Sequence, residues 1–145
     1  MSDLHYLSIA EAGAAIRDRR VSSAELVEAC LTRIDTVDGD LHAFITVTGA
    51  DARAAAVAAD RAIAEGGWKG PLHGVPIALK DIYSTAGVRT TCHSRLLHDN
   101  VPQEDAETVA RLKAAGAIVV GKLATHEFAF GGPSHDLPWP AARNP

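Results

Sequence analysis

Lys80 is the residue whose placement in this sequence most strongly suggests chemistry. It ends the short apolar run Val75–Leu79, which a turn-rich stretch containing Gly70 and Gly74 leads into. Burial disfavours the charged form of an amine, so a lysine at the end of an apolar strand needs a partner or a use. An amine held neutral by burial could serve as general base for a hydroxyl nucleophile. The alternative, which the residues alone leave open, is a strand-end salt bridge, for instance with Glu127 or Asp136.

A second motif resembles a phosphate-binding loop. The residues from Gly116 to Lys122 match the spacing GxxxxGK. Leu123 stands where that motif requires serine or threonine, and the four residues between the two glycines are Ala-Ile-Val-Val, which is typical of a strand. We therefore interpret this stretch as a strand that contributes to the core and not as a nucleotide site.

Cysteine and histidine give weaker signals. Cys92 could be a nucleophile with His93 beside it, but catalytic partners are usually brought together by the fold, and a plain buried or loop cysteine is the favoured interpretation. His126 lacks a second histidine four residues later, and His93 and His98 are five apart in an expected loop. These histidines do not have the spacing of metal ligands, and we expect neither a metal nor a cofactor.

Length and composition describe an ordinary globular chain. Its 145 residues suit one domain, with 47% hydrophobic and 22% charged residues and a net charge of −4. Lysine and arginine are scattered, which argues against a nucleic-acid or anionic-membrane surface. No apolar run approaches the roughly 18 residues of a membrane span, and no secretory signal is recognisable. Cys30 and Cys92 are too isolated for a disulfide framework, so a cytoplasmic location is expected.

The elements that must position Lys80 can be read from periodicity and from helix signals. The sequences Ser8-Ile-Ala-Glu11 and Ser22-Ser-Ala-Glu25 each open an expected helix with a capping box, and Asp38-Gly39-Asp40 is expected to stop the second. The further expected elements are helices over 51–65 and 104–115, strands over 43–47, 75–80 and 117–121, and a loop over 88–102. The order strand, helix, strand predicts a βαβ crossover and a parallel strand pair in an α/β domain.

Beyond these patterns, the stretch Gly70–Asp81, GPLHGVPIALKD, closely resembles the lysine-bearing motif of the amidase signature family. That family includes stand-alone amidases and the A subunit of tRNA-dependent amidotransferases. The similar segments that accompany it, in the family's order, are Thr85–Thr91 with Ser94, Asp105–Lys122, Glu127–Gly131 and Arg143–Pro145. The N-terminal pair of helices is similar as well, so the resemblance covers almost the whole chain.

The resemblance implies an incomplete α/β/α amidase-signature fold, with N-terminal helices followed by the first strands of a mixed sheet. Residues 1–145 would be the N-terminal part of a single amidase domain acting on a small-molecule amide. The family hydrolyses amides with a Ser–cis-Ser–Lys triad, in which Lys80 falls on the catalytic lysine. Gly131, Gly132 and Ser134 match the segment that lines the family's substrate pocket.

The sequence departs from the family in two respects. No serine in these 145 residues lies in a Gly-Ser-Ser context, so both triad serines would fall beyond Pro145 and we expect the chain alone to be inactive. His93 stands where glycine is common in the family, which should alter the loop near Ser94. The alternative function is a non-catalytic fragment that binds a partner chain or associates with itself through exposed strand edges.

Overall fold

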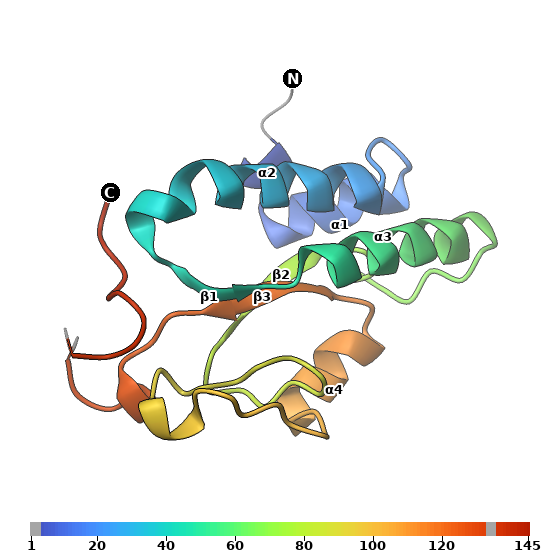
Figure 1. The fold of residues 1–145 in the computed structure, drawn as a ribbon. Coiled ribbons are helices and arrows are strands. Elements are labelled where there is room, and N and C mark those ends of the chain that lie inside the picture. Colours follow the sequence, from blue (N-terminus) through green and yellow to red (C-terminus); the bar gives the residue numbers. More distant parts are fainter. Residues whose placement is uncertain (1–3, 133–135) are drawn as a thin grey trace. The chain divides into compact units, whose positions relative to one another are not determined.

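The computed structural model describes residues 4–132 and 136–145 (Figure 1). Their helices and strands, in chain order, are α1 (Ile9–Arg17), α2 (Ser23–Leu41), β1 (Phe44–Val47), α3 (Gly49–Ala64), β2 (Pro76–Lys80), α4 (Glu107–Ala114) and β3 (Ile118–Leu123). Three short 3-10 turns cover Leu4–Tyr6, Arg95–Leu97 and Glu127–Ala129. This order of helices and strands, with the mixed sheet described below, confirms the expected α/β class.

The described residues divide into two compact units. The first comprises residues 4–36, 48–77 and 111–120, and the second comprises residues 37–47, 78–110, 121–132 and 136–145. The division falls inside β2, between Ile77 and Ala78, and inside β3, between Val120 and Gly121. Lys80 and the loop that follows it therefore belong to the second unit.

The first unit has a core of small and aliphatic side chains. Its buried cluster consists of Ala12, Ile16, Leu26, Ile63 and Val75. Helix α1 is started by the expected capping box, because Ser8 Oγ accepts the Glu11 N–H at 3.3 Å and Glu11 Oε2 accepts the Ser8 N–H at 2.8 Å. The alanine-rich helix is confirmed as α3.

The expected end of the second helix was wrong. Helix α2 continues through Asp38, Gly39 and Asp40 to Leu41, and His42 follows it with a φ of 52°. The reason is that the Asp38 carboxylate bonds forward along the chain. Its Oδ1 accepts the backbone N–H groups of Ala43 and Phe44 at 2.7 and 3.2 Å, so it secures the exit from the helix and does not interrupt it.

The expected start of the fourth helix was also too early. Helix α4 begins at Glu107, so Glu104 and Asp105 precede it. Asp105 is used elsewhere, since its Oδ1 accepts the Ala86 N–H at 2.8 Å. An acidic residue near a helix start can cap a neighbouring turn instead of joining the helix, and the sequence pattern does not separate these two uses.

The strands form a mixed three-stranded sheet in the order β1-β3-β2. Strands β1 and β3 are antiparallel, with Thr46 opposite Lys122 and an irregularity between Phe44 and Thr46. On the other side of β3, the Ile118 N–H donates to Val75 O and the Asp81 N–H donates to Leu123 O, both at 2.9 Å. These positions advance together along both strands, so β2 and β3 are parallel, which confirms the βαβ crossover.

Strand β3 also settles the character of the GxxxxGK stretch. Its four intervening residues lie at the end of the α4–β3 turn and in β3, where Ile118 and Val120 are buried. They form strand and core as expected, and no phosphate-binding loop is formed. Among the described residues, no helix has both the length and the apolar character of a membrane span.

Candidate active site

Lys80 is the last residue of β2, and its side chain is exposed while Leu79 and Asp81 on either side of it are buried. Alternation along the strand accounts for this, because the neighbours of an outward-pointing residue point inward. Lys80 borders a cavity of about 280 Å³. The other residues that border it include His93, Thr125, His126, Leu137, Ala141 and Ala142.

The expected burial of the Lys80 amine was therefore wrong, because the side chain is exposed. Among the described residues, no ion pair joins Lys80 to Glu127, one of the two partners named for the alternative salt bridge. Glu127 instead accepts a hydrogen bond from Ser94 Oγ at 2.6 Å. The exposed amine borders the cavity and can therefore meet a group that enters it.

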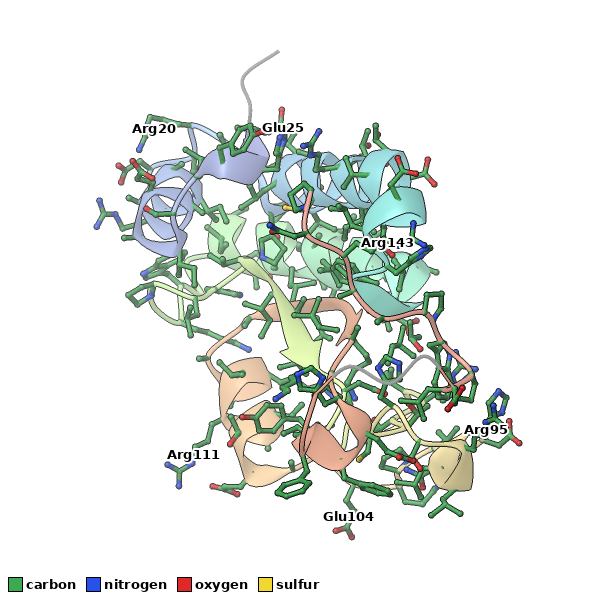
Figure 2. The ribbon with its side chains drawn as sticks, turned by 90° about the vertical axis from the view of Figure 1, so that its left-hand side faces the viewer. Arg20, Glu25, Arg95, Glu104, Arg111 and Arg143 are labelled. Atoms are coloured by element: carbon green, nitrogen blue, oxygen red, sulfur yellow. The ribbon has the colours of Figure 1, made fainter. Side chains whose placement is uncertain are left out.

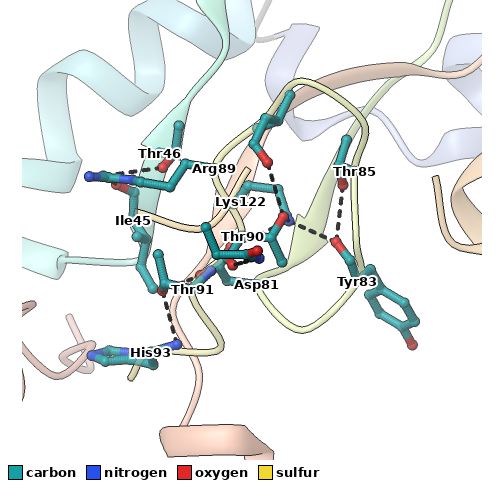
Figure 3. Close-up of polar contacts among 12 residues, drawn as sticks. Ile45, Thr46, Asp81, Tyr83, Thr85, Arg89, Thr90, Thr91, His93 and Lys122 are labelled. Carbon is teal, nitrogen blue, oxygen red and sulfur yellow. Dashed lines mark hydrogen bonds and ion pairs between the residues drawn. The ribbon is translucent and has the colours of Figure 1, made fainter. Parts of the chain in front are cut away.

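The lysine that is buried is Lys122, on β3. Its side chain and that of Asp81 are both fully buried, and Lys122 Nζ lies 3.3 Å from Asp81 Oδ1 (Figure 3). Burial lowers the pKa of Lys122, and the negative charge of Asp81 opposes that effect. Sequence reasoning missed this pair, although a lysine inside the apolar segment 117–123 was a signal that could have revealed it.

The pair is surrounded by hydrogen-bonding groups from the loop that follows β2. Lys122 Nζ donates to Tyr83 O at 2.8 Å and to Thr90 Oγ1 at 2.6 Å (Figure 3). Asp81 Oδ2 accepts the N–H and the hydroxyl of Thr91 at 2.9 and 2.6 Å. Asp81 Oδ1 accepts no hydrogen bond and faces Lys122 as an ion pair. These contacts fix Asp81, the first residue of the loop, directly after Lys80.

The backbone around Asp81 is fixed in the same way. Its N–H donates to Leu123 O and its carbonyl accepts the Cys92 N–H, each at 2.9 Å. The position of Lys80 is thus determined by the residue next to it, because the backbone N–H, the carbonyl and the carboxylate of Asp81 all have bonding partners. Thr90 and Thr91 both hydrogen-bond to the buried charges, Thr90 to Lys122 and Thr91 to Asp81.

Cys92 does not have the environment of an activated nucleophile. Burial raises the pKa of its thiol, the Asp81 carboxylate raises it further, and Lys122 opposes both. The ring of the adjacent His93 is engaged elsewhere, because Nδ1 accepts the Thr125 N–H at 3.3 Å and Nε2 lies 3.2 Å from Trp139 O. The cysteine is therefore a partly buried loop residue, as the favoured interpretation had it.

The backbone at His93 has a conformation that favours glycine. Its φ is 55° and that of Cys92 is 50°, values that favour glycine over residues with a side chain. The histidine is 2% exposed, and both ring nitrogens have hydrogen-bond partners. These contacts hold a strained backbone that glycine would adopt without them.

The segment expected to line a substrate pocket is only partly described. Gly131, with a φ of 82°, and Gly132 are both exposed, and neither is among the described residues that border the Lys80 cavity. Ser134 lies outside the described residues. In the part of the chain that is described, no three residues among histidine, cysteine, aspartate and glutamate gather in a way that could hold a metal ion.

Comparison with known proteins gives consistent matches. Residues 25–145 match the family model described as Amidase. The chain is 48% identical over 151 residues to the A subunit of glutamyl-tRNA(Gln) amidotransferase from Anaeromyxobacter sp. (strain K), covering 99% of this chain and 30% of that protein. It is 44% identical over 145 residues to an amidase of Pseudomonas putida, covering 100% of this chain and 30% of that protein.

A solved structure matches the fold. It is the inhibitor-bound form of a complex described as vestigial and as revealing the evolutionary origins of an s-triazine catabolic enzyme. The TM-score is 0.89 at 35% sequence identity, and the match covers 96% of this chain and 31% of that one. The chain thus spans about 30% of the length of the curated relatives that it matches.

Proposed function

The chain belongs to the amidase family, and on that premise we propose that it supplies the lysine of an enzyme that hydrolyses the carbon–nitrogen bond of amides. One observation supports this proposal above the others. Lys80 is the exposed last residue of β2 and borders a cavity, and the buried Asp81–Lys122 pair fixes the chain directly after it. A general base must come within roughly 2.6–3.2 Å of the hydroxyl that it deprotonates, which requires an accessible and well-positioned amine.

The proposed mechanism is the Ser–cis-Ser–Lys route of the family. Lys80 takes a proton from a bridging serine, that serine takes the proton of the nucleophilic serine, and the nucleophile attacks the amide carbonyl. Backbone N–H groups stabilise the oxyanion of the tetrahedral intermediate, and its collapse releases the amine. No serine of the 145 residues lies in a Gly-Ser-Ser context, so neither of the two triad serines is identified in this chain. We therefore propose that this chain alone does not turn over amides.

We further propose that both compact units belong to one amidase domain, of which residues 1–145 are the N-terminal part. The exposed glycines at 131 and 132, together with Ser134, would contribute to its substrate pocket. The substrate would be a small-molecule amide, and the relatives named as an amidase and as the A subunit of an amidotransferase offer two versions of that chemistry. A cytoplasmic location stays a prediction from the sequence.

A chimera tests the catalytic proposal. The chain would replace the matching 30% of the Pseudomonas putida amidase, and ammonia release from simple amides would be measured. Lys80→Ala should reduce the rate by about 10²–10⁴-fold, the usual contribution of a general base. Lys69→Ala is the matched control, because Lys69 is also exposed but lies in the first unit. A Lys80→Ala chimera as active as its parent would disprove the assignment.

A second candidate function is a non-catalytic chain that binds a partner or a second copy of itself. The observation that favours it is the strand order, since β1 and β2 are both edges of the described sheet and Val47 on β1 is 46% exposed. Sedimentation of the purified chain over a range of concentrations tests self-association. A monomer at every concentration, unfolding in one cooperative transition, would contradict it.

A further inference from the structure

Trp139 is held by three side chains from the loop that follows β2. The guanidinium carbon of Arg89 lies 5.6 Å from the centroid of the indole. The His98 ring stacks on it, with centroids 5.3 Å apart and planes inclined by 18°, and the His93 ring meets it edge-on at 5.8 Å and 89°. A cation and two aromatic rings on one indole form a specific contact and not a casual one.

The backbone of the same residue is also bound. His93 Nδ1 must be the acceptor of its hydrogen bond, because the backbone N–H of Thr125 can only donate. Its Nε2 therefore carries the proton and donates to Trp139 O at 3.2 Å. His93 thus links Trp139 to Thr125, and both His93 and Thr125 border the Lys80 cavity.

The residues on either side of Trp139 form another part of the cavity wall. Leu137, Ala141 and Ala142 border the cavity. Their side chains are apolar, so these side chains cannot form hydrogen bonds to the loop. The ends of this segment are held at Asp136, whose carbonyl accepts from the Arg95 guanidinium, and at Arg143, whose N–H donates to Leu41 O. The side chains of Arg95 and Arg143 are labelled in Figure 2. Between those two points, Trp139 secures the segment through its ring contacts and through the hydrogen bond from His93 to its carbonyl.

We propose that Trp139 is a positioning residue, which holds residues 137–142 in place as an apolar wall of the Lys80 cavity. The wall would contact the apolar part of an amide and direct its carbonyl group toward the reacting groups. The importance of this cavity rests on the proposed function, through the role of Lys80. The physical claim, that Trp139 keeps one side of the cavity closed, does not need catalysis and is tested without it.

Competitive acylation of the folded 145-residue chain measures that claim. Acetic anhydride is added at low ratio, and peptide mass spectrometry gives the labelling rate of Lys80 relative to the exposed Lys69 in the same molecules. Trp139→Ala should raise the Lys80 rate several-fold relative to Lys69, because the wall loses its anchor. Lys122 is fully buried in the second unit and should stay unlabelled, which reports that this unit has not unfolded.

Two further variants keep the test informative. Trp139→Phe retains a ring that can stack, so it should keep the Lys80 rate close to that of the unmodified chain. His98→Ala removes one ring from the contact without altering the wall and should give a smaller rise, which keeps the proposal testable even where Trp139→Ala fails to fold. Leu96→Ala is the control, since this side chain lies in the same loop and is 83% exposed.

Several outcomes would overturn the proposal. An unchanged Lys80 rate in folded Trp139→Ala would show that other contacts hold the wall. A joint rise of Lys80 and Lys122 would show that Trp139 only stabilises the unit, and a Trp139→Phe rate equal to that of Trp139→Ala would exclude the stacked ring as the anchor. The proposed function has its own separate test in the Lys80→Ala chimera, so either proposal can fail while the other stands.

Discussion

Lys122 Nζ lies 3.3 Å from Asp81 Oδ1, and neither side chain has any exposed surface. This pair joins β3 to the residue that immediately follows Lys80, so it connects the centre of the sheet to the candidate base. A buried pair of opposite charges is costly unless polar groups surround it. Here hydroxyl, N–H and carbonyl groups of Tyr83, Thr90 and Thr91 bond to Lys122 Nζ and Asp81 Oδ2, while Asp81 Oδ1 has only the ion pair.

Breaking this pair should be costly. We expect Lys122→Met and Asp81→Asn each to lower the free energy of unfolding by about 3–5 kcal/mol, because each leaves an uncompensated buried group. Urea denaturation of the purified variants measures it. The matched control is Arg53→Met, which breaks an ion pair with Glu28 of 2.7 Å whose partners are more than half exposed. That exposed pair should be worth only about 0–1 kcal/mol.

The double variant Asp81→Asn/Lys122→Met tests whether the two charges act on each other. Because it removes both charges, it should be more stable than the sum of the two single changes indicates. If the loss in free energy of unfolding of the double variant equalled the sum of the two single losses, the two charges would not act on each other. Asp81 and Lys122 would then stabilise the unit independently, through their threonine and carbonyl partners alone.

Two glycines with different surroundings give an opposed pair of predictions. A Cβ at Gly121 would lie 2.5 Å from Thr46 O and 2.8 Å from Phe44 Cδ1, so Gly121→Ala should separate β1 from β3 and destabilise the fold. A Cβ at Gly39, inside α2, would meet nothing within 4 Å. Gly39→Ala should therefore stabilise the chain by roughly 0.5–1 kcal/mol, the usual gain in a helix interior.

Thermal unfolding followed by circular dichroism compares the two variants directly. The expected result is a lower melting temperature for Gly121→Ala and a higher one for Gly39→Ala. If Gly121→Ala melted like the unaltered chain, β1 and β3 would not approach each other as closely as the register at Thr46 and Lys122 requires.

Cys92 should react slowly with an alkylating agent and only at high pH. Its raised pKa means a smaller thiolate fraction at any given pH than for a thiol of ordinary pKa, and the thiolate is the reactive form. The rate of iodoacetamide modification, followed by mass spectrometry as a function of pH, should have a higher midpoint in the folded chain than for an ordinary thiol, because the pKa of Cys92 is raised. The same chain in denaturant serves as the reference, and a lower midpoint in the folded chain would identify an activated cysteine.

Local sequence signals predicted most of the elements. The capping box at Ser8, the alanine-rich helix and the strands before Lys80 and after Gly116 depend on contacts between near neighbours, and all were confirmed. The failures came where a side chain bonds outside its own element. Asp38 accepts the Ala43 N–H beyond α2, and the helix continues past its expected end. Asp105 accepts the Ala86 N–H, and α4 begins after it.

The candidate site divides in the same way. The motif around Lys80 was sufficient to indicate the family, because a family motif is a property of residues in order. The motif did not show whether the Lys80 side chain is buried. Strand alternation allows either face to be the inner one until the sheet is packed. The inner face holds Asp81, and the buried amine is contributed by Lys122 from a strand much later in the chain.

The sequence by itself thus determined the family, the order of helices and strands and the position of the candidate lysine, since these depend on local patterns. Only the tertiary structure decided that Lys80 is exposed at a cavity, that Asp81 pairs with Lys122 and that Trp139 is held by Arg89, His93 and His98. The physical reason is that burial and pairing depend on which distant segments meet, and no spacing along the chain specifies that meeting.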